Sequence, residues 1–164
     1  QKVLIHAASG GVGTFAVQFA KWKGAYVIGT ASEENMDFLY DLGADEVIDY
    51  KTKKFEDKVK DVDLVFDMMG GETQKRSLNV IKEGGRLVTT VQPGNQEAAK
   101  AKNIQVIGFL AKSYPADLQQ IADLIDSGKI KPIVTEIFPL QEAAKAQEHI
   151  ETHHTRGKIV LKVI

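Results

Sequence analysis

A turn of small residues within the stretch 2–13 has the spacing that points most directly to chemistry. Ala8, Gly10 and Gly13 occupy the three small-residue positions of a Gly-x-Gly-x-x-Gly pattern, with alanine in the first position. A helix that begins directly after such a turn leaves its first backbone N–H groups without intrahelical partners and has a partial positive charge at that end. The pattern therefore predicts a phosphate-binding turn, although a tight turn without a ligand has the same pattern.

The histidines form a second set of residues that could do chemistry. His149 and His153 lie four residues apart with His154 beside them, a spacing that can hold a metal ion. No third ligand is well placed, so a solvated helix end is the favoured interpretation and we predict no metal site. His6 ends the first strand, just before the glycine turn, where a structural hydrogen-bonding role is favoured over catalysis.

Tyr50 and Lys54 form a Tyr-x-x-x-Lys pattern, which is the arrangement of the catalytic pair in short-chain dehydrogenases. In those enzymes the pair lies far downstream of the glycine turn, so we interpret the pattern here as a coincidence. No other set of acid and base residues stands out. We therefore predict no catalytic residue within this chain.

The composition is that of one soluble globular domain: 164 residues, 43% hydrophobic and 26% charged, with a formal net charge of −1. Mixed charges exclude an extended surface for nucleic acid or anionic membrane. The absence of cysteine excludes disulfides, thiolate nucleophiles and cysteine-based zinc sites within the chain. No apolar run approaches the roughly 20 residues that span a bilayer. We expect a cytoplasmic protein and, because the first strand starts abruptly, a piece of a longer chain.

Strands and helices alternate along the first two thirds of the chain and position the glycine turn. After the first strand, further strands are predicted at 25–30, 46–49, 62–69, 86–91 and 104–110. Helices are predicted at 12–23, from Ser32 to Gly43, and at 72–82, 97–102 and 116–127. This alternation predicts an α/β fold of the Rossmann type, a doubly wound parallel six-stranded sheet with helices on both faces. Its first strand leads into the glycine turn, where that architecture binds a dinucleotide.

Two of these helices have apolar faces that should pack on a sheet, and a tail follows them. The first face contains Val12, Phe15, Ala16, Phe19 and Ala20, and the second contains Leu118, Ile121, Ala122 and Ile125. The tail adds a strand at 133–138, a helix at 140–150 and a strand at 158–163. We therefore divide the chain into a Rossmann domain, 1–132, and a C-terminal segment, 133–164.

Several segments, in the right order, resemble the cofactor-binding domain of the medium-chain dehydrogenase/reductase family, in its quinone oxidoreductase-like (zinc-binding dehydrogenase) branch. The first is His-Ala-Ala-Ser-Gly-Gly-Val-Gly at 6–13. The others are 42–50, 62–67 followed by the glycine pair 70–71, 84–88 and 128–132, and in the tail 138–144 and 157–161. The resemblance covers essentially all 164 residues.

The resemblance implies an oxidoreductase function and a further, N-terminal domain in the parent protein. Family members have an N-terminal GroES-like substrate domain, absent here, to which segment 133–164 would return. The parent would transfer hydride from the nicotinamide to a quinone or an α,β-unsaturated carbonyl, and this chain alone should bind cofactor with little or no turnover. Alternatives are the cofactor domain of a zinc-dependent alcohol dehydrogenase of the same family, a non-enzymatic nucleotide-binding module and an S-adenosylmethionine methyltransferase. The match through the tail argues against the methyltransferase.

The resemblance also implies which residues bind the dinucleotide. The backbone of Ser9, Gly10, Gly11 and Val12 would bind the pyrophosphate. The nicotinamide half would lie beyond the carboxyl ends of the later strands, near Met69, Gly70, Val91, Gln92, Phe109 and Leu110. The apolar members of this second set could equally belong to the core or to an interface.

The end of the second strand should distinguish NADP from NAD. Enzymes that use NAD carry an acidic residue there, about 20 positions after the glycine pattern, and in this branch the position falls at Ser32. Because serine does not repel a 2′-phosphate, we predict NADP (NADPH) as cofactor in preference to NAD. NADP-preferring relatives have a lysine where this chain has Asn35 or Met36, and a tyrosine that matches Tyr50. Lys51 or Lys53 could supply positive charge for the 2′-phosphate, and Arg156 and His153 of the tail could approach the cofactor's phosphate.

Family members commonly form dimers by pairing the sixth strands of two sheets, which here would use 104–110. The returning strands, left without most of their partner, add unpaired edges that invite association with another copy. We expect a homodimer with a nicotinamide dinucleotide as ligand, and neither nucleic acid nor membrane as a partner.

Overall fold

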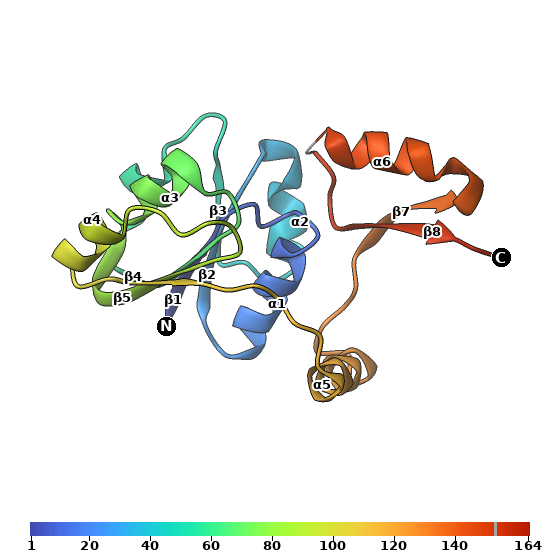
Figure 1. The fold of residues 1–164 in the computed structure, drawn as a ribbon, viewed down its shortest axis with the longest axis horizontal. Coiled ribbons are helices and arrows are strands. Elements are labelled where there is room, and N and C mark those ends of the chain that lie inside the picture. The colour runs from blue at the N-terminus through green and yellow to red at the C-terminus, as the bar shows by residue number, and fades with distance from the viewer. Residues whose placement is uncertain (153) are drawn as a thin grey trace.

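A parallel sheet of six strands forms the centre of the molecule, in the order β3-β2-β1-β4-β5-β6 (Figure 1). The computed structural model describes residues 1–152 and 154–164. The strands are β1 (Lys2–Ile5), β2 (Tyr26–Ala31), β3 (Glu46–Asp49), β4 (Val62–Asp67), β5 (Ile81–Thr89) and β6 (Gln105–Gly108). This order confirms the predicted Rossmann architecture and brings the carboxyl ends of β1 and β4 together where the strand order reverses.

The alternation of side chains along the strands divides the core into two layers. Leu4 of β1 lies in register with Ile28 of β2 and Val65 of β4, and all three belong to one buried cluster. Val3 and Ile5, the neighbours of Leu4, belong to the second cluster on the opposite face. A parallel sheet that is covered on both faces buries consecutive side chains, which explains the unbroken apolar runs in the sequence.

Helices α1 (Gly13–Trp22) and α2 (Met36–Asp41) cover one face, and α3 (Gly71–Ser77) and α4 (Gln96–Ala101) cover the other (Figure 1). Short 3-10 turns, η1 (Glu33–Asn35) and η2 (Phe55–Asp57), complete the loops. The predicted helix 72–82 was too long. The chain enters β5 at Ile81, which lies in register with Val62, and the Val62 N–H donates to the Val80 carbonyl at 2.9 Å. Val80 and Ile81 are buried and β-branched, which favours sheet pairing over a longer helix.

The apolar face predicted for the first helix is confirmed only in part, because Ala16 and Ala20 pack against a buried cluster but are themselves only partly buried. The buried residues of α1 are Gly13, Thr14, Val17 and Gln18. Val12, just before the helix, is 51% exposed. The Gln18 side chain is buried because it binds the backbone of a distant segment. Its Nε2 donates to the Thr14 carbonyl at 2.9 Å and to the Lys131 carbonyl at 3.1 Å, and its Oε1 accepts from the Lys131 N–H at 2.8 Å.

The last third of the chain leaves the central sheet. Helix α5 (Pro115–Asp126) has no fully buried residue; of its predicted apolar face, Leu118 is 57% exposed, whereas Ile121, Ala122 and Ile125 are partly buried. Strand β7 (Val134–Pro139), turn η3 (Leu140–Glu142), helix α6 (Ala143–Glu151) and strand β8 (Lys158–Lys162) then form the predicted strand-helix-strand tail, with β7 and β8 parallel. No helix among the described residues combines the length and apolar character that crossing a membrane requires.

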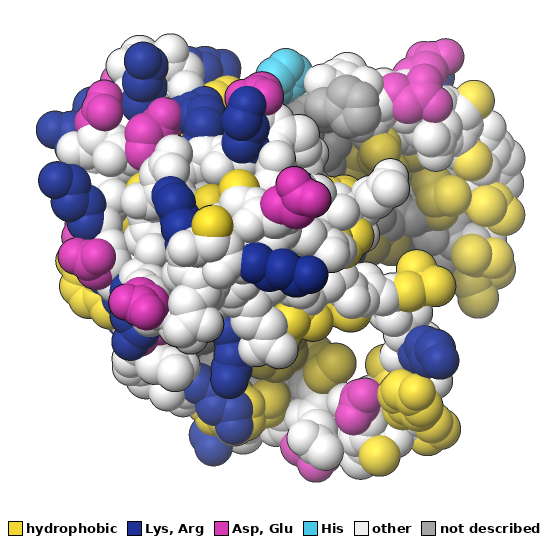
Figure 2. Space-filling model, turned by 60° about the vertical axis from the view of Figure 1, so that its left-hand side comes forward, with side chains coloured by type: hydrophobic (Ala, Val, Ile, Leu, Met, Phe, Trp, Pro, Cys, Tyr) yellow, Lys and Arg dark blue, Asp and Glu magenta, His cyan; other side chains and the backbone are white. Residues whose placement is uncertain are grey.

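Side chains of different kinds are distributed unevenly over the surface. Figure 2 shows lysines and arginines interspersed with acidic side chains over the part that contains the central sheet. Hydrophobic side chains gather on the side of the tail and α5 (Figure 2). The exposed apolar residues there include Ile137, Val160, Leu161 and Val163.

Candidate functional site

The glycine turn lies at the carboxyl end of β1 and is fixed to both neighbouring strands. His6 directly follows β1, and its N–H donates to the Phe66 carbonyl of β4 at 3.1 Å. The Ala8 N–H donates to the Thr30 carbonyl of β2, also at 3.1 Å. A Cβ atom on Gly13 would lie 2.2 Å from the Ala7 carbonyl oxygen, so only glycine allows the first residue of α1 to pass this close to the turn. A Cβ on Gly10 would meet only that same oxygen, at 3.4 Å.

A cavity of about 380 Å³ opens beside this turn, and six of the eleven predicted cofactor residues line it. They come from four segments that are far apart in the sequence: Ser9, Gly10, Ser32, Asn35, Tyr50 and Met69. The sequence did not single out several further lining residues, among them Thr30, Glu34, Phe55, Thr73, Arg76 and Thr155. Only the folded sheet shows that these belong together, because the signal at each position is an ordinary polar or aromatic residue.

His6 lies at the base of the cavity and is 1% exposed. Its ring nitrogens bind two hydroxyl groups, Nδ1 with Thr30 Oγ1 at 3.1 Å and Nε2 with Ser77 Oγ at 2.9 Å. Ser77 Oγ donates its proton to the Thr73 carbonyl at 2.7 Å, so Nε2 carries the His6 proton and Nδ1 accepts from Thr30. Burial lowers the pKa of His6 to about 4. A neutral imidazole with both nitrogens engaged fits the predicted structural role.

The end of β2 carries a connected set of polar side chains. Ser32 and Asn35 are buried, at 5% and 7% exposure, and Asn35 Nδ2 donates to Ser32 Oγ at 3.0 Å. Ser32 Oγ in turn donates to Glu34 Oε1 at 2.8 Å. The Ser32 hydroxyl therefore binds neighbouring side chains, although a serine before a helical turn usually caps a backbone N–H.

Arg156 reaches this same place from the tail. Its Nε donates to Asn35 Oδ1 at 2.6 Å, and its Nη2 donates to the Glu34 carbonyl at 2.9 Å. The guanidinium also lies 5.0 Å from the centre of the Phe38 ring. Arg156 therefore contacts η1, the turn that follows β2, and its approach to a cofactor phosphate stays a prediction. His153, its predicted companion, lies outside the described residues.

The loop after β3 presents Tyr50 and two lysines. Tyr50 is 53% exposed, and Lys53 lines the cavity with it. Lys51 Nζ lies 3.9 Å from Glu34 Oε1. Asp49 holds the loop because it accepts from Thr52 Oγ1 at 2.6 Å and from the Lys51 N–H at 3.0 Å; these two bonds, with that of Thr52 the larger, keep the Asp49 pKa below its usual value.

A second basic group on the wall is already paired. Arg76 donates from Nε and Nη2 to the two oxygens of Glu56, at 2.7 and 2.5 Å. This bidentate bond lowers the Glu56 pKa and raises the Arg76 pKa. The guanidinium also lies 4.8 Å from the centre of the Phe55 ring. Arg76 therefore shapes the cavity wall, and its charge is largely neutralised.

The buried carboxylate of Asp67 organises the loops after β4 and β5. It accepts hydrogen bonds from the N–H groups of Met69 and Gly70, from Gln74 Nε2 at 2.8 Å and from Thr89 Oγ1 at 3.1 Å. Gln74 Oε1 then accepts from the Gly94 N–H at 2.7 Å. This network fixes the region that the sequence predicted for the nicotinamide half.

Five predicted cofactor residues do not line the cavity. A Cβ on Gly70 would lie 3.0 Å from Val91 Cγ2, so these two are neighbours at the ends of β4 and β5, and Phe109 is 46% exposed after β6. Val12 is exposed at the start of α1. Gly11 lies under the tail, where a Cβ would be 3.0 Å from the Gly157 carbonyl oxygen.

The tail completes the cavity at this point. The Gly157 N–H donates to the Ser9 carbonyl at 2.9 Å, and His154 and Thr155 line the cavity. The Thr155 hydroxyl oxygen is buried and has no hydrogen-bond partner among the described residues. An unsatisfied hydroxyl on the wall, beside the glycine turn, fits a cavity that accepts a polar ligand such as a dinucleotide.

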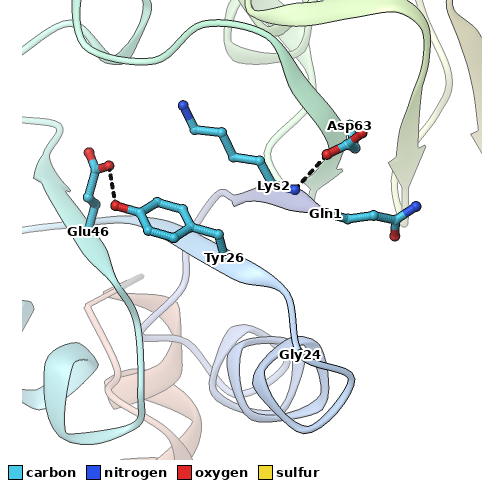
Figure 3. Close-up of a pocket in the computed structure, with 6 residues that line it drawn as sticks. All are labelled: Gln1, Lys2, Gly24, Tyr26, Glu46 and Asp63. Carbon is cyan, nitrogen blue, oxygen red and sulfur yellow. Dashed lines mark hydrogen bonds between the residues drawn. The ribbon is translucent and has the colours of Figure 1, made fainter.

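A larger hollow, of about 540 Å³, lies at the opposite edge of the sheet and is shallow (Figure 3). Its two carboxylates already accept hydrogen bonds: the Tyr26 hydroxyl donates to Glu46 Oε1 at 2.7 Å, and the Lys2 backbone N–H donates to Asp63 Oδ2 at 2.6 Å. It lies at the amino ends of the strands, whereas parallel sheets bind ligands at the carboxyl ends. We therefore place the functional site in the smaller cavity.

No group of three or more potential metal ligands occurs among residues 1–152 and 154–164. Of the predicted histidine set, His149 Nε2 lies 3.1 Å from Glu136 Oε1, and the backbone N–H of His154 donates to Thr152 Oγ1. His153, the central member of that set, is outside the part of the chain that the structure describes.

Comparisons with known proteins agree with this architecture. A family profile described as zinc-binding dehydrogenase matches residues 42–161. The chain is 34% identical over 192 residues to the mitochondrial NAD(P)H oxidoreductase RTN4IP1 of Danio rerio, covering 100% of this chain and 49% of that protein. The solved quinone oxidoreductase of Coxiella burnetii is 39% identical with a TM-score of 0.94, covering 99% of this chain and 53% of that one.

The Escherichia coli quinone oxidoreductase, solved in complex with NADPH, is 29% identical with a TM-score of 0.89, over 99% of this chain and 57% of that one. The chain therefore spans about half the length of the proteins that it matches. By the profile match and the likeness to these proteins over its whole length, the chain belongs to the zinc-binding dehydrogenase family, in its quinone oxidoreductase-like branch.

Proposed function

We propose that this chain is the cofactor-binding domain of an oxidoreductase and that it binds a nicotinamide dinucleotide in the cavity beside the glycine turn. The observation that carries the proposal is the close passage of Gly13 past the Ala7 carbonyl, at the topological switch point of a Rossmann sheet. Ser9, Gly10, Gly11 and Val12 would bind the pyrophosphate through their backbone. Met69, Gly70, Val91 and Phe109 would lie near the nicotinamide.

The chain's own residues would bind and orient the cofactor, and the bound nicotinamide would supply the hydride. Asp67 fixes the loops of Met69 and Gly70, and neutral His6 keeps the cavity floor rigid. No acid or base of this chain is assigned to the reaction. The acceptor proposed from the family is a quinone or an α,β-unsaturated carbonyl, and the rest of the protein would present it.

We further propose NADPH in preference to NADH. Ser32 occupies the position at the end of β2 where NAD enzymes carry an acidic residue. Asn35, Tyr50 and Lys53 line the same part of the cavity, and Lys51 lies beside it. A lysine ammonium near a 2′-phosphate adds an attraction that a 2′-hydroxyl does not receive.

A titration of the chain with NADPH and NADH, followed by nucleotide fluorescence, tests both statements. We expect saturable binding of both, with the lower Kd for NADPH. Competition with S-adenosylmethionine is the control for a different ligand of the same fold. If neither dinucleotide binds at millimolar concentration, the proposed function is wrong; if NADH binds more tightly, only the preference is wrong.

We also propose a homodimer that forms through the edge of β6, the last strand of the sheet. The outer side of this strand has no sheet neighbour among the described residues, and an unpaired edge can continue a sheet into a second copy. Sedimentation analysis at micromolar concentration, combined with hydrogen exchange of residues 105–108, tests this proposal. A monomer, or a dimer whose β6 amides exchange rapidly, would contradict it.

The cytoplasmic location expected from the sequence also stays a proposal. The names of several relatives, such as the Danio rerio protein, describe them as mitochondrial. Cell fractionation of the full-length protein would decide between the two compartments.

A further inference from the structure

A carboxylate that the sequence did not single out lies at the ribose end of the cavity. Glu34, in the 3-10 turn after β2, lines the cavity and accepts the hydrogen bond of Ser32 Oγ at 2.8 Å. Its side chain is 65% exposed, and Lys51 Nζ lies 3.9 Å from the same oxygen. A carboxylate with one short hydrogen bond and one long ion pair, both to the same oxygen, has lone pairs left for a ligand.

This carboxylate is also supported from behind. Ser32 Oγ accepts from Asn35 Nδ2, and Asn35 Oδ1 accepts from Arg156 Nε. Because a hydroxyl has a single proton, the Ser32 hydroxyl cannot donate to a phosphate while it donates to Glu34. Ser32 is neutral and does not itself repel a 2′-phosphate. Its hydroxyl proton, however, orients the negatively charged Glu34 carboxylate at the cavity wall.

We propose that Glu34 is the residue that discriminates at the ribose 2′ position, with Arg156 as its positioning residue through Asn35 and Ser32. The inference rests on the proposed function, since it requires a dinucleotide in this cavity. Glu34 accepts a hydrogen bond from a 2′-hydroxyl and repels a 2′-phosphate, whereas Lys51 and Lys53 attract the phosphate. The two influences oppose each other, so the preference for NADPH is narrow.

The test compares Glu34→Gln with Glu33→Gln, which removes the same charge one residue earlier. Glu33 is exposed and does not line the cavity, so it controls for the general electrostatic field. Kd values for NADPH and NADH are measured for wild type and both variants at low and at 0.5 M salt, and thermal melting confirms that both variants are folded.

We expect E34Q to raise the ratio of NADPH affinity to NADH affinity about five- to tenfold, as expected for one charge removed beside a partly exposed phosphate. E33Q should change that ratio less than about twofold, and high salt should reduce the E34Q effect. Equal changes of the affinity ratio in the two variants, or no change in E34Q, would overturn the inference. The proposed function would still stand in that case, provided that wild type binds a dinucleotide. If wild type binds neither dinucleotide, the proposed function fails, and this inference with it.

Discussion

At the residue scale, substitutions of two glycines in the same turn should have different effects, one on stability and the other on ligand binding. A Cβ on Gly13 would lie 2.2 Å from the Ala7 carbonyl oxygen and 2.6 Å from that of Ala8, so Gly13→Ala must displace the start of α1. A clash with backbone of this kind costs about 3 kcal/mol or more of the free energy of unfolding. Urea denaturation should show a clear loss of stability for G13A and almost none for Gly10→Ala, whose Cβ has room.

The same pair tests the cavity. The G10A methyl group would lie at the cavity wall, where the pyrophosphate is proposed to approach the backbone. G10A should therefore fold normally and bind dinucleotide at least about tenfold more weakly, because a backbone approach is blocked. A folded G10A with wild-type affinity would remove the glycine turn from the proposed site.

The buried His6 should make the stability of the protein depend on pH. Its pKa is about 4 in the folded protein, below the ordinary value of 6.5, so between these values the unfolded chain binds more protons and stability falls as the pH falls. This stabilisation is fully present above about pH 6.5, and about 3 kcal/mol of it is lost by pH 4. In His6→Gln, the slope of unfolding free energy between pH 6.5 and 4 should decrease; carboxylates such as Asp49 leave a residual slope. An unchanged slope would contradict the buried neutral state.

At the scale of elements, Gln18 joins α1 to the segment that leads into the tail. Gln18→Ala removes three hydrogen bonds and leaves the N–H and carbonyl of Lys131 without their partner. We expect a loss of about 2 kcal/mol in stability and faster proteolysis near residues 128–133. Gln119→Ala is the matched control, because Gln119 binds only exposed Asp123 on α5. Equal protease sensitivity in the two variants would show that Gln18 does not hold this segment.

The elements also show what the sequence could and could not predict. The parallel six-stranded sheet, the glycine turn and the strand-helix-strand tail could be predicted, because the apolar runs and the family segments that indicate them are local patterns. The burial of Gln18 did not, since its partner Lys131 lies 113 residues away. The start of β5 at Ile81 and the partial covering of the apolar face of α5 likewise depend on neighbours that are distant in the sequence. In the site, the sequence pointed to Ser32 because serine has no negative charge. The role proposed for Glu34 could not be predicted, because it depends on the direction of its side chain in the folded protein.

At the scale of the whole molecule, the apolar residues of the tail should govern association. Ile137 is 64% exposed and Val163 is 68% exposed, and hydrophobic side chains gather on this side (Figure 2). The double substitution Ile137→Lys with Val163→Lys should reduce concentration-dependent association in light scattering and leave dinucleotide affinity unchanged, because neither residue lines the cavity. Gln96→Lys with Ser113→Lys serves as the control, because both residues are exposed, lie outside the tail and the cavity, and gain the same two positive charges. Association that persists unchanged would point instead to the β6 edge.

The hydrogen bond from Gly157 to Ser9 has a consequence for the order of events during synthesis. The six strands of the central sheet have all left the ribosome once residue 108 has emerged, and domains fold as units while the chain grows. Thr155 and Gly157 emerge far later, yet Thr155 lines the cavity and the Gly157 N–H donates to the Ser9 carbonyl of the glycine turn. The complete wall of the proposed dinucleotide site is therefore available only after the tail has docked.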